Sequence, residues 1–97
     1  MPDAIFCTND YMAAGALKML RAHGVRVPQD VLLVGYDNTD IATALDPELT
    51  TVDNHFFDLG RTLASSLLSL IDRQIESVAV NLTPELILRR SHTLAAS

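Results

Sequence analysis

The chain has 97 residues, of which 48% are hydrophobic and 5% aromatic, and its net charge is −5 at pH 7. This length corresponds to one small domain, and the acidic balance argues against binding of nucleic acid by these residues alone. No apolar run approaches the roughly 20 residues of a membrane span, and the N-terminal residues lack a signal-peptide pattern. We therefore expect a cytoplasmic protein that makes no contact with a membrane.

The first third of the chain has the pattern of a strand, a helix and a second strand. Residues 4–7 form a short apolar run, in which the single cysteine, Cys7, is expected to be a buried, inert thiol. A helix is predicted from Asp10, because apolar residues recur at helical spacing until Gly24, a residue type that favours helix ends. Residues 31–34 are apolar on both faces, as in a strand covered on two sides. The pattern predicts a βαβ unit with parallel strands.

The remainder predicts two more strands and a second helix. Residues 50–52 are expected to form a short strand after a loop, and Asp53 or Asn54 is expected to cap a helix that ends near residues 72–74. Residues 78–82 alternate in polarity, and residues 86–88 predict a last strand. The helix carries a stripe of leucines: Leu59, Leu63, Leu67 and Leu70. The order of elements predicts an α/β fold, as part of a doubly wound, mostly parallel sheet.

An Asp/Asn pair follows each of the first three predicted strands, at residues 9–10, 37–38 and 53–54. Ligands of open α/β sheets bind outside the carboxyl ends of the strands, so the three pairs predict one polar pocket. Carboxylates and amides suit the hydroxyls of a sugar or the edge of a nucleobase. Phe56 is placed either to stack on such a ligand or to pack in the core. Asp and Asn also cap helices and form turns, which is the alternative for each single pair.

Other chemistries have little support in the sequence. The glycine-rich phosphate motifs, the nucleophile elbow and zinc-ligand spacings do not occur, so we expect no cofactor, no metal and no catalytic residue. The three histidines stand in different segments and are interpreted as polar surface or loop residues. A hard-cation site at residues 37–40 is the weaker alternative, because it needs more oxygen ligands than this stretch supplies.

The sequence resembles the LacI/GalR family of transcriptional regulators over nearly its whole length. Residues 2–17, PDAIFCTNDYMAAGAL, match a long family segment, and the family's later motifs follow in the same order and spacing. These are GVRVPQDV at 24–31, VGYDN at 34–38, PELTTV at 47–52, LG at 59–60 and LILRRS at 86–91.

The resemblance implies a two-lobed, periplasmic-binding-protein-like fold with a sugar or nucleobase effector between the lobes. Residues 1–53 are expected to belong to the second lobe, 54–76 to form a crossover helix of the first lobe, 77–92 to form returning strands and 93–97 a tail. The resemblance also implies a homodimer that holds operator DNA through an N-terminal headpiece, which these residues do not include.

Site residues follow from the matched motifs. The effector contacts implied by the resemblance are Asp37, Asn9, Asn54 and Phe56. The dimer contacts implied are Ala14, Leu17, Lys18 and the stretch from Ile41 to residue 46, notably Leu45. Packing of Leu17 on the sheet is the alternative for that residue.

Two other functional classes stay open. A solute-binding protein of a sugar transporter would share the fold and the pocket, although the spacing between residues 34–37 and 50–52 favours the regulator. An α/β enzyme with an acidic site would require turnover or dependence on a metal.

Overall fold

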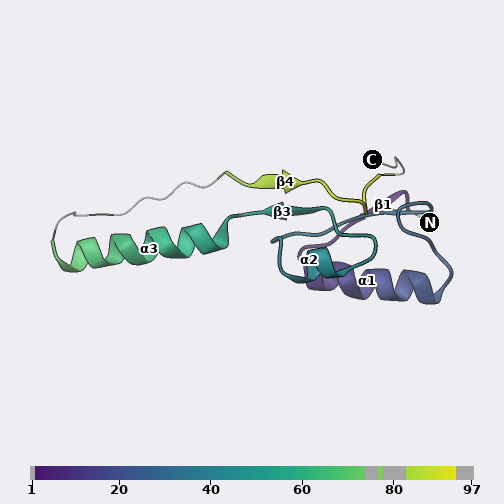
Figure 1. Cartoon of the computed structure of the whole chain (residues 1–97), viewed down its shortest axis with the longest axis horizontal. Coiled ribbons are helices and arrows are strands. Elements are labelled where there is room, and N and C mark those ends of the chain that lie inside the picture. Colours follow the sequence, from purple (N-terminus) through teal and green to yellow (C-terminus); the bar gives the residue numbers. More distant parts are fainter. Residues whose placement is uncertain (1, 74–76, 78–82, 94–97) are drawn as a thin grey trace. The chain divides into compact units, whose positions relative to one another are not determined.

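Figure 1 shows the computed structural model, which describes residues 2–73, 77 and 83–93. The chain divides into two compact units, Met1–Asp53 with Glu85–Ser97, called unit 1, and Asn54–Pro84, called unit 2. No helix within the described ranges has the length and apolar character needed to cross a membrane.

Unit 1 begins with the predicted βαβ unit. Strand β1 (Ala4–Phe6) leads into helix α1 (Asp10–Ala22), and strand β2 (Leu32–Val34) pairs with β1 in parallel. The Asn9 side chain caps α1 by accepting a hydrogen bond from the Met12 backbone N–H. After the helix, Gly24 has a φ of 73°, a conformation that glycine adopts without steric cost. The predicted helix start and end are confirmed.

The rest of unit 1 contains an element that the sequence pattern missed. Residues 41–46 were expected to be a loop, but helix α2 (Ile41–Ala44) lies within them. Strand β3 (Thr51–Asp53) follows, and Thr50 just before it forms an isolated parallel bridge with Val34 of β2. Strand β4 (Glu85–Ile87) pairs with β3 in antiparallel orientation. The predicted strands at 50–52 and 86–88 are each found shifted by one residue.

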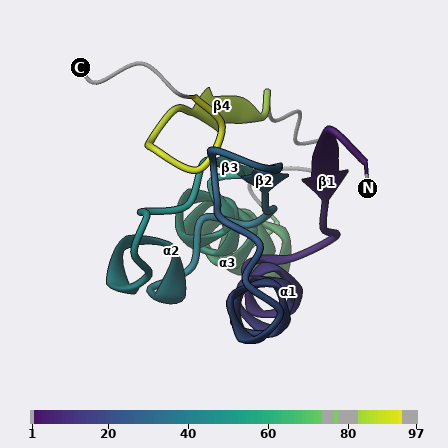
Figure 2. The same ribbon diagram turned by 90° about the vertical axis from the view of Figure 1, so that its right-hand side faces the viewer.

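The core of unit 1 lies between the strands and helices α1 and α2, which Figure 2 shows on the same side of β1 and β2. Leu33 of β2 and Leu49, just before β3, are almost completely buried, and Ala13 and Leu17 of α1 pack against the same cluster. Cys7 is buried as predicted, and this burial raises the pKa of its thiol. The predicted burial of Cys7 is thus confirmed, and its inertness stays a prediction, which the raised pKa supports because it leaves little thiolate.

Unit 2 contains helix α3 (Phe56–Ile71). Its N-cap residue is His55, which has a left-handed backbone with φ of 56°, so the predicted cap at Asp53 or Asn54 is wrong. Asp53 is the last residue of β3, and its carboxylate accepts a hydrogen bond from the Asn38 amide instead. The helix ends at Ile71 with Asp72 as C-cap, as expected. The predicted alternation at residues 78–82 lies outside the described residues.

Candidate functional site

The turn after β2 has two consecutive non-glycine residues with positive φ. Asp37 has φ of 100° and Asn38 has φ of 51°. Residues other than glycine rarely adopt a positive φ, because this backbone conformation is unfavourable for them. It persists only where contacts with the surrounding structure offset its free-energy cost. The Asp37 backbone N–H donates to the Val52 carbonyl oxygen at 2.8 Å, which fixes the turn to β3. A strained turn at the carboxyl end of a buried strand is typical of a binding site.

The Asp37 side chain is half-buried. No group within residues 2–73, 77 and 83–93 forms a hydrogen bond or ion pair with its carboxylate. The carboxylate therefore combines a restrained position with unused hydrogen-bond acceptors. This is the property expected of a residue that binds a polar ligand.

Asn38, by contrast, makes hydrogen bonds within unit 1 through its backbone N–H and both polar atoms of its side chain. Its Oδ1 accepts a hydrogen bond from Nη2 of Arg89 at 2.8 Å, and its Nδ2 donates to Oδ2 of Asp53 at 3.2 Å. Its backbone N–H donates to the Thr51 hydroxyl at 3.3 Å. Two of the residues in the predicted Asp/Asn pairs, Asn38 and Asp53, are thus bonded to each other.

Asp10 is a buried structural residue with no exposed surface. Its Oδ2 accepts hydrogen bonds from the Thr39 backbone N–H at 2.6 Å and the Thr39 hydroxyl at 3.0 Å. Its Oδ1 accepts from the Thr51 hydroxyl at 2.6 Å. Asp10 therefore ties the start of α1 to the segments after β2 and in β3, and its carboxylate is not presented to a ligand.

Asn9 is half-buried, and its Oδ1 is used in the cap of α1. The capping alternative considered for this residue type thus applies to Asn9. Contact with an effector through its Nδ2 group is compatible with the cap, and it stays a prediction.

Asn54 and Phe56, the other predicted effector contacts, belong to unit 2. Asn54 is half-buried, and Phe56, at the start of α3, is 54% exposed. Phe56 therefore does not pack in a core among the described residues. Its proposed stacking on a ligand stays a prediction.

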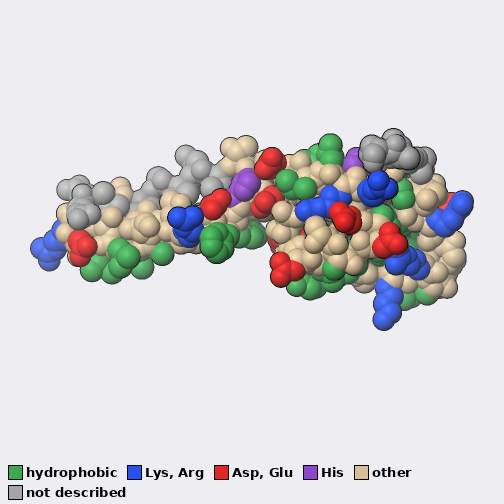
Figure 3. All heavy atoms as spheres, in the orientation of Figure 1, with side chains coloured by type: hydrophobic (Ala, Val, Ile, Leu, Met, Phe, Trp, Pro, Cys, Tyr) green, Lys and Arg blue, Asp and Glu red, His purple; other side chains and the backbone are tan. Residues whose placement is uncertain are grey.

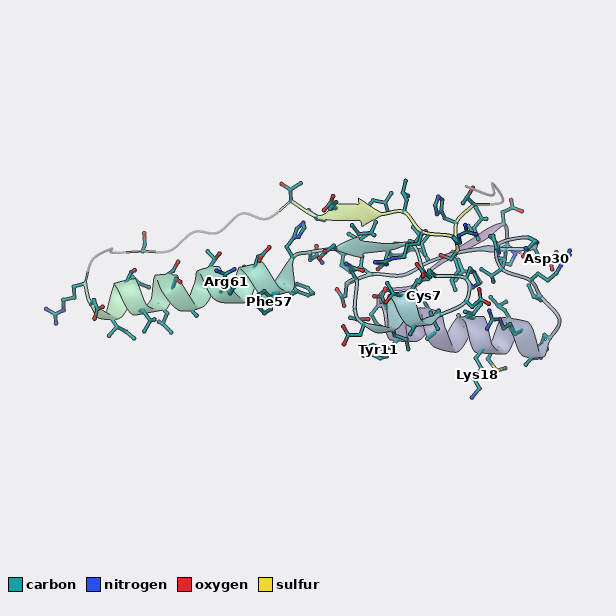
Figure 4. The ribbon with its side chains drawn as sticks, in the orientation of Figure 1. Cys7, Tyr11, Lys18, Asp30, Phe57 and Arg61 are labelled. Carbon is teal, nitrogen blue, oxygen red and sulfur yellow. The ribbon has the colours of Figure 1, made fainter. Side chains whose placement is uncertain are left out.

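The predicted dimer contacts divide into buried and accessible residues. Leu17 is 2% exposed and packs in the core of unit 1, so its side chain is not available to a second subunit, as the packing alternative holds. Lys18 is exposed and projects from α1 away from the strands, as Figure 4 shows. Ala14, Ile41 and Leu45 are half-buried, and Leu45 also packs against the core.

Three further residues of this region were not predicted as part of it: Thr39, Thr51 and Arg89. Thr51 stands within the predicted strand at 50–52, and Arg89 directly follows the predicted strand at 86–88. Two signals in the sequence could have identified these residues. One is a polar residue within a buried strand, and the other is an arginine directly after a predicted strand. Among the described residues, no group of three or more His, Cys, Asp or Glu side chains is arranged to hold a metal ion.

Comparisons with known proteins agree with the fold. The profile of the family described as "Periplasmic binding protein-like domain" matches residues 1–92. The HTH-type transcriptional repressor PurR of Haemophilus influenzae (strain PittEE) is 40% identical over 95 residues, which cover 94% of this chain and 28% of the repressor. PurR of Salmonella arizonae is 42% identical over 91 residues, covering 93% of this chain and 27% of the repressor. The chain thus spans about 28% of the length of the curated relatives it matches.

Solved structures of similar sequence have the same fold. A LacI-type transcription regulator from Bifidobacterium animalis subsp. lactis has a TM-score of 0.84 at 42% identity, covering 96% of this chain and 34% of that one. A CelR–cellobiose complex has a TM-score of 0.85 at 39% identity, covering 92% and 28%. The Lac repressor dimer bound to operator and the anti-inducer ONPF has a TM-score of 0.84 at 35% identity, covering 94% and 32%.

Proposed function

This chain belongs to the periplasmic-binding-protein-like domain family, in the form found in LacI-type regulators, and we propose that it binds a small effector for a bacterial transcriptional regulator. The observation that carries the proposal is the Asp37 carboxylate, held at the end of β2 on a backbone with φ of 100°. The carboxylate accepts hydrogen bonds from hydroxyl or amino groups of the effector. Binding requires no bond-breaking step, so the site needs acceptors and donors rather than a nucleophile.

A carbohydrate is the effector class that we propose. Fixed carboxylate and amide groups fit neighbouring hydroxyls, and the similar CelR structure is a complex with cellobiose. A nucleobase presents amino groups to the same carboxylate and is the second candidate within this proposal. Asn9, Asn54 and Phe56 are the further contacts that we propose, with Phe56 stacking on an apolar face of the ligand.

The effector acts by shifting a population of states. A ligand that binds one conformation more tightly than another shifts the protein towards that conformation. The free energy of DNA binding can change by no more than the difference between the ligand's binding free energies for the two conformations. We place operator binding in a helix-turn-helix segment, which none of these 97 residues provides, and dimerisation in this domain. The operator-bound Lac repressor dimer, similar over 94% of this chain, supports that assignment. A regulator of this kind works in the cytoplasm.

The competing classes have weaker support. The matched relatives are named as repressors rather than enzymes, and the solved structures include regulators bound to an operator or to an effector. A solute-binding protein of a transporter would share the pocket, but it would require neither a DNA-binding segment nor a response of DNA affinity to the ligand.

The decisive variant is Asp37→Gly in the full protein. Glycine removes the carboxylate and adopts positive φ without strain, so binding is weakened while the fold is kept or stabilised. Calorimetry with cellobiose, lactose, guanine and hypoxanthine first identifies which compound the unaltered protein binds. Loss of the carboxylate leaves ligand groups unpaired and costs about 1–3 kcal/mol, which weakens the affinity about fivefold to 150-fold.

Asp40→Ala is the matched control, because Asp40 is an exposed carboxylate three residues away. Its affinity for the ligand should equal that of the unaltered protein. Undiminished binding by Asp37→Gly would remove Asp37 from the site. Failure of the unaltered protein to bind any of the four compounds would contradict the proposed effector classes.

A further inference from the structure

Arg89 connects the chain after β4 to the turn after β2. Its Nη2 donates to Oδ1 of Asn38 at 2.8 Å, and its Nη1 donates to the carbonyl oxygen of Leu49 at 2.9 Å. Its backbone N–H donates to the hydroxyl of Thr50 at 2.9 Å. The backbone N–H and Nη1 of Arg89 are thus held by Thr50 and Leu49, just before β3. These two bonds restrain the guanidinium, so Nη2 has a fixed position from which it donates to Asn38.

Both polar atoms of the Asn38 side-chain amide have a hydrogen-bond partner. The carbonyl oxygen accepts from Arg89, and the amide nitrogen donates to Oδ2 of Asp53. An aspartate at position 38 would accept from the arginine but would place a second carboxylate against Asp53. The two contacts together therefore specify an amide and fix its orientation.

The turn held in this way is the one that carries Asp37. Asn38 itself has φ of 51°, and the preceding Asp37 has φ of 100°. Two adjacent residues in this region cost free energy, and they persist only where the surroundings supply contacts that other conformations lose. Asn38 has three such contacts: it accepts a hydrogen bond from Arg89, and it donates to the Asp53 carboxylate and to the Thr51 hydroxyl.

We propose that Arg89 is a positioning residue for the effector site: it holds Asn38, and through it the left-handed turn that presents the Asp37 carboxylate. The inference rests on the proposed role of Asp37 in effector binding. Arginine suits this task because its planar guanidinium directs separate N–H groups at two acceptors, Leu49 O and Asn38 Oδ1. A lysine ammonium on a flexible stem orients Asn38 less firmly.

The test uses amide hydrogen exchange followed by NMR in the full protein without ligand. Two amides with equal bond lengths are compared: Asp37 N–H, 2.8 Å from Val52 O, reports on the turn, and Cys7 N–H, 2.8 Å from Val34 O, reports on the sheet. In Arg89→Met, we expect Asp37 to exchange about tenfold faster, because a charge-assisted hydrogen bond is lost, while Cys7 is unchanged. Arg89→Lys should give a smaller increase.

Arg21→Met is the matched control, since it removes an exposed arginine from α1. Asn38→Ala should also accelerate exchange at Asp37. The double variant Arg89→Met, Asn38→Ala should exchange little faster at Asp37 than Asn38→Ala alone, because both changes break the same hydrogen bond between Arg89 and Asn38. Equal acceleration at Asp37 and Cys7 in both Arg89 variants would overturn the proposal, because Arg89 would then support only the fold. The measurement needs no effector, so its outcome is separate from the binding test of Asp37→Gly.

Discussion

Gly35 lies against the buried carboxylate of Asp10 at the end of β2. A Cβ added to Gly35 would overlap Oδ1 of Asp10 and lie 2.7 Å from Cδ2 of Leu49 and 3.3 Å from Cα of Asp10. Asp10 cannot withdraw without breaking its bonds to Thr39 and Thr51, and the Leu49 side chain is almost completely buried. Position 35, two residues before Asp37, is therefore restricted to glycine by space rather than by its own φ.

We predict that Gly35→Ala lowers the free energy of unfolding by about 1–3 kcal/mol, the usual cost of overpacking a core. Urea denaturation of the full protein measures it. Gly15→Ala is the control, because nothing lies within 4 Å of an added Cβ there and alanine favours the helix. Equal stability of Gly35→Ala and the unaltered protein would show that the Asp10 contacts relax freely.

The individual roles of the Asp/Asn pairs could be predicted only in part. Each pair directly follows a predicted strand. Because the carboxyl ends of parallel strands lie at the same edge of a sheet, the sequence indicated where these polar residues would gather. The sequence could not show that Asp10 is buried and bonded to Thr39, since that partner is 29 residues away. Nor could it show that Asn38 bonds to Arg89, across 51 residues. Such partners depend on tertiary packing, which local patterns do not encode.

Helix α1 presents an apolar surface to solvent on the side opposite its core face. Tyr11, Met12 and Met19 are between 55% and 62% exposed, and Gly15 and Lys18 lie between them. These positions recur at helical spacing, so they form one face. We call this face the α1 surface, and we assign it to the dimer interface that we propose, in place of the buried Leu17.

Gly15→Glu tests the α1 surface in the full protein. Apart from its chain neighbours and the backbone of α1 itself, no described atom lies within 4 Å of a Cβ added at Gly15, so the described residues leave space for a side chain at this position. In a two-fold dimer the surface meets its own copy, and two glutamates would face each other. We expect analytical ultracentrifugation to show a shift from dimer towards monomer, with Gly15→Ala remaining dimeric. A dimer that keeps its affinity with Gly15→Glu would exclude this face.

Most elements of the fold were predictable, and the exceptions have physical reasons. β1, α1 and β2 follow from apolar runs and capping residues that act locally. Helix α2 has four residues, too few to produce a helical repeat in the sequence. His55, as N-cap of α3, offers no side-chain cap bond, so the start of that helix has no sequence signal of the usual kind.

At the scale of the whole molecule, α3 stands out because none of its residues is buried. Phe57, Leu67, Leu68 and Ile71 are each more than half exposed, and Figure 3 shows hydrophobic side chains at the surface along this helix. Leu63 is 46% exposed. Burial of a leucine is worth about 1.5–3 kcal/mol, so covering this face yields free energy comparable with the stability of a small domain.

We predict that the 97-residue chain, expressed by itself, associates with further copies of itself through α3. Two copies that bury their apolar helix faces against each other remove the same leucines from water. Sedimentation velocity over a range of concentrations measures the association. The variant Leu63→Gln, Leu67→Gln, Leu68→Gln should shift the equilibrium towards monomer, and because glutamine is a good helix former, the helix itself is retained.

The control for this variant changes the polar face of the same helix. Thr62→Gln and Ser65→Gln alter residues that line a shallow hollow with Asp58 and Arg61, and they leave the leucines in place. This control should associate like the unaltered chain. Monomeric sedimentation of the unaltered chain, together with cooperative unfolding and a Leu63 amide protected from exchange, would contradict the prediction. In that case, contacts within a single copy must cover α3, because an uncovered helix of 16 residues is only marginally stable in water.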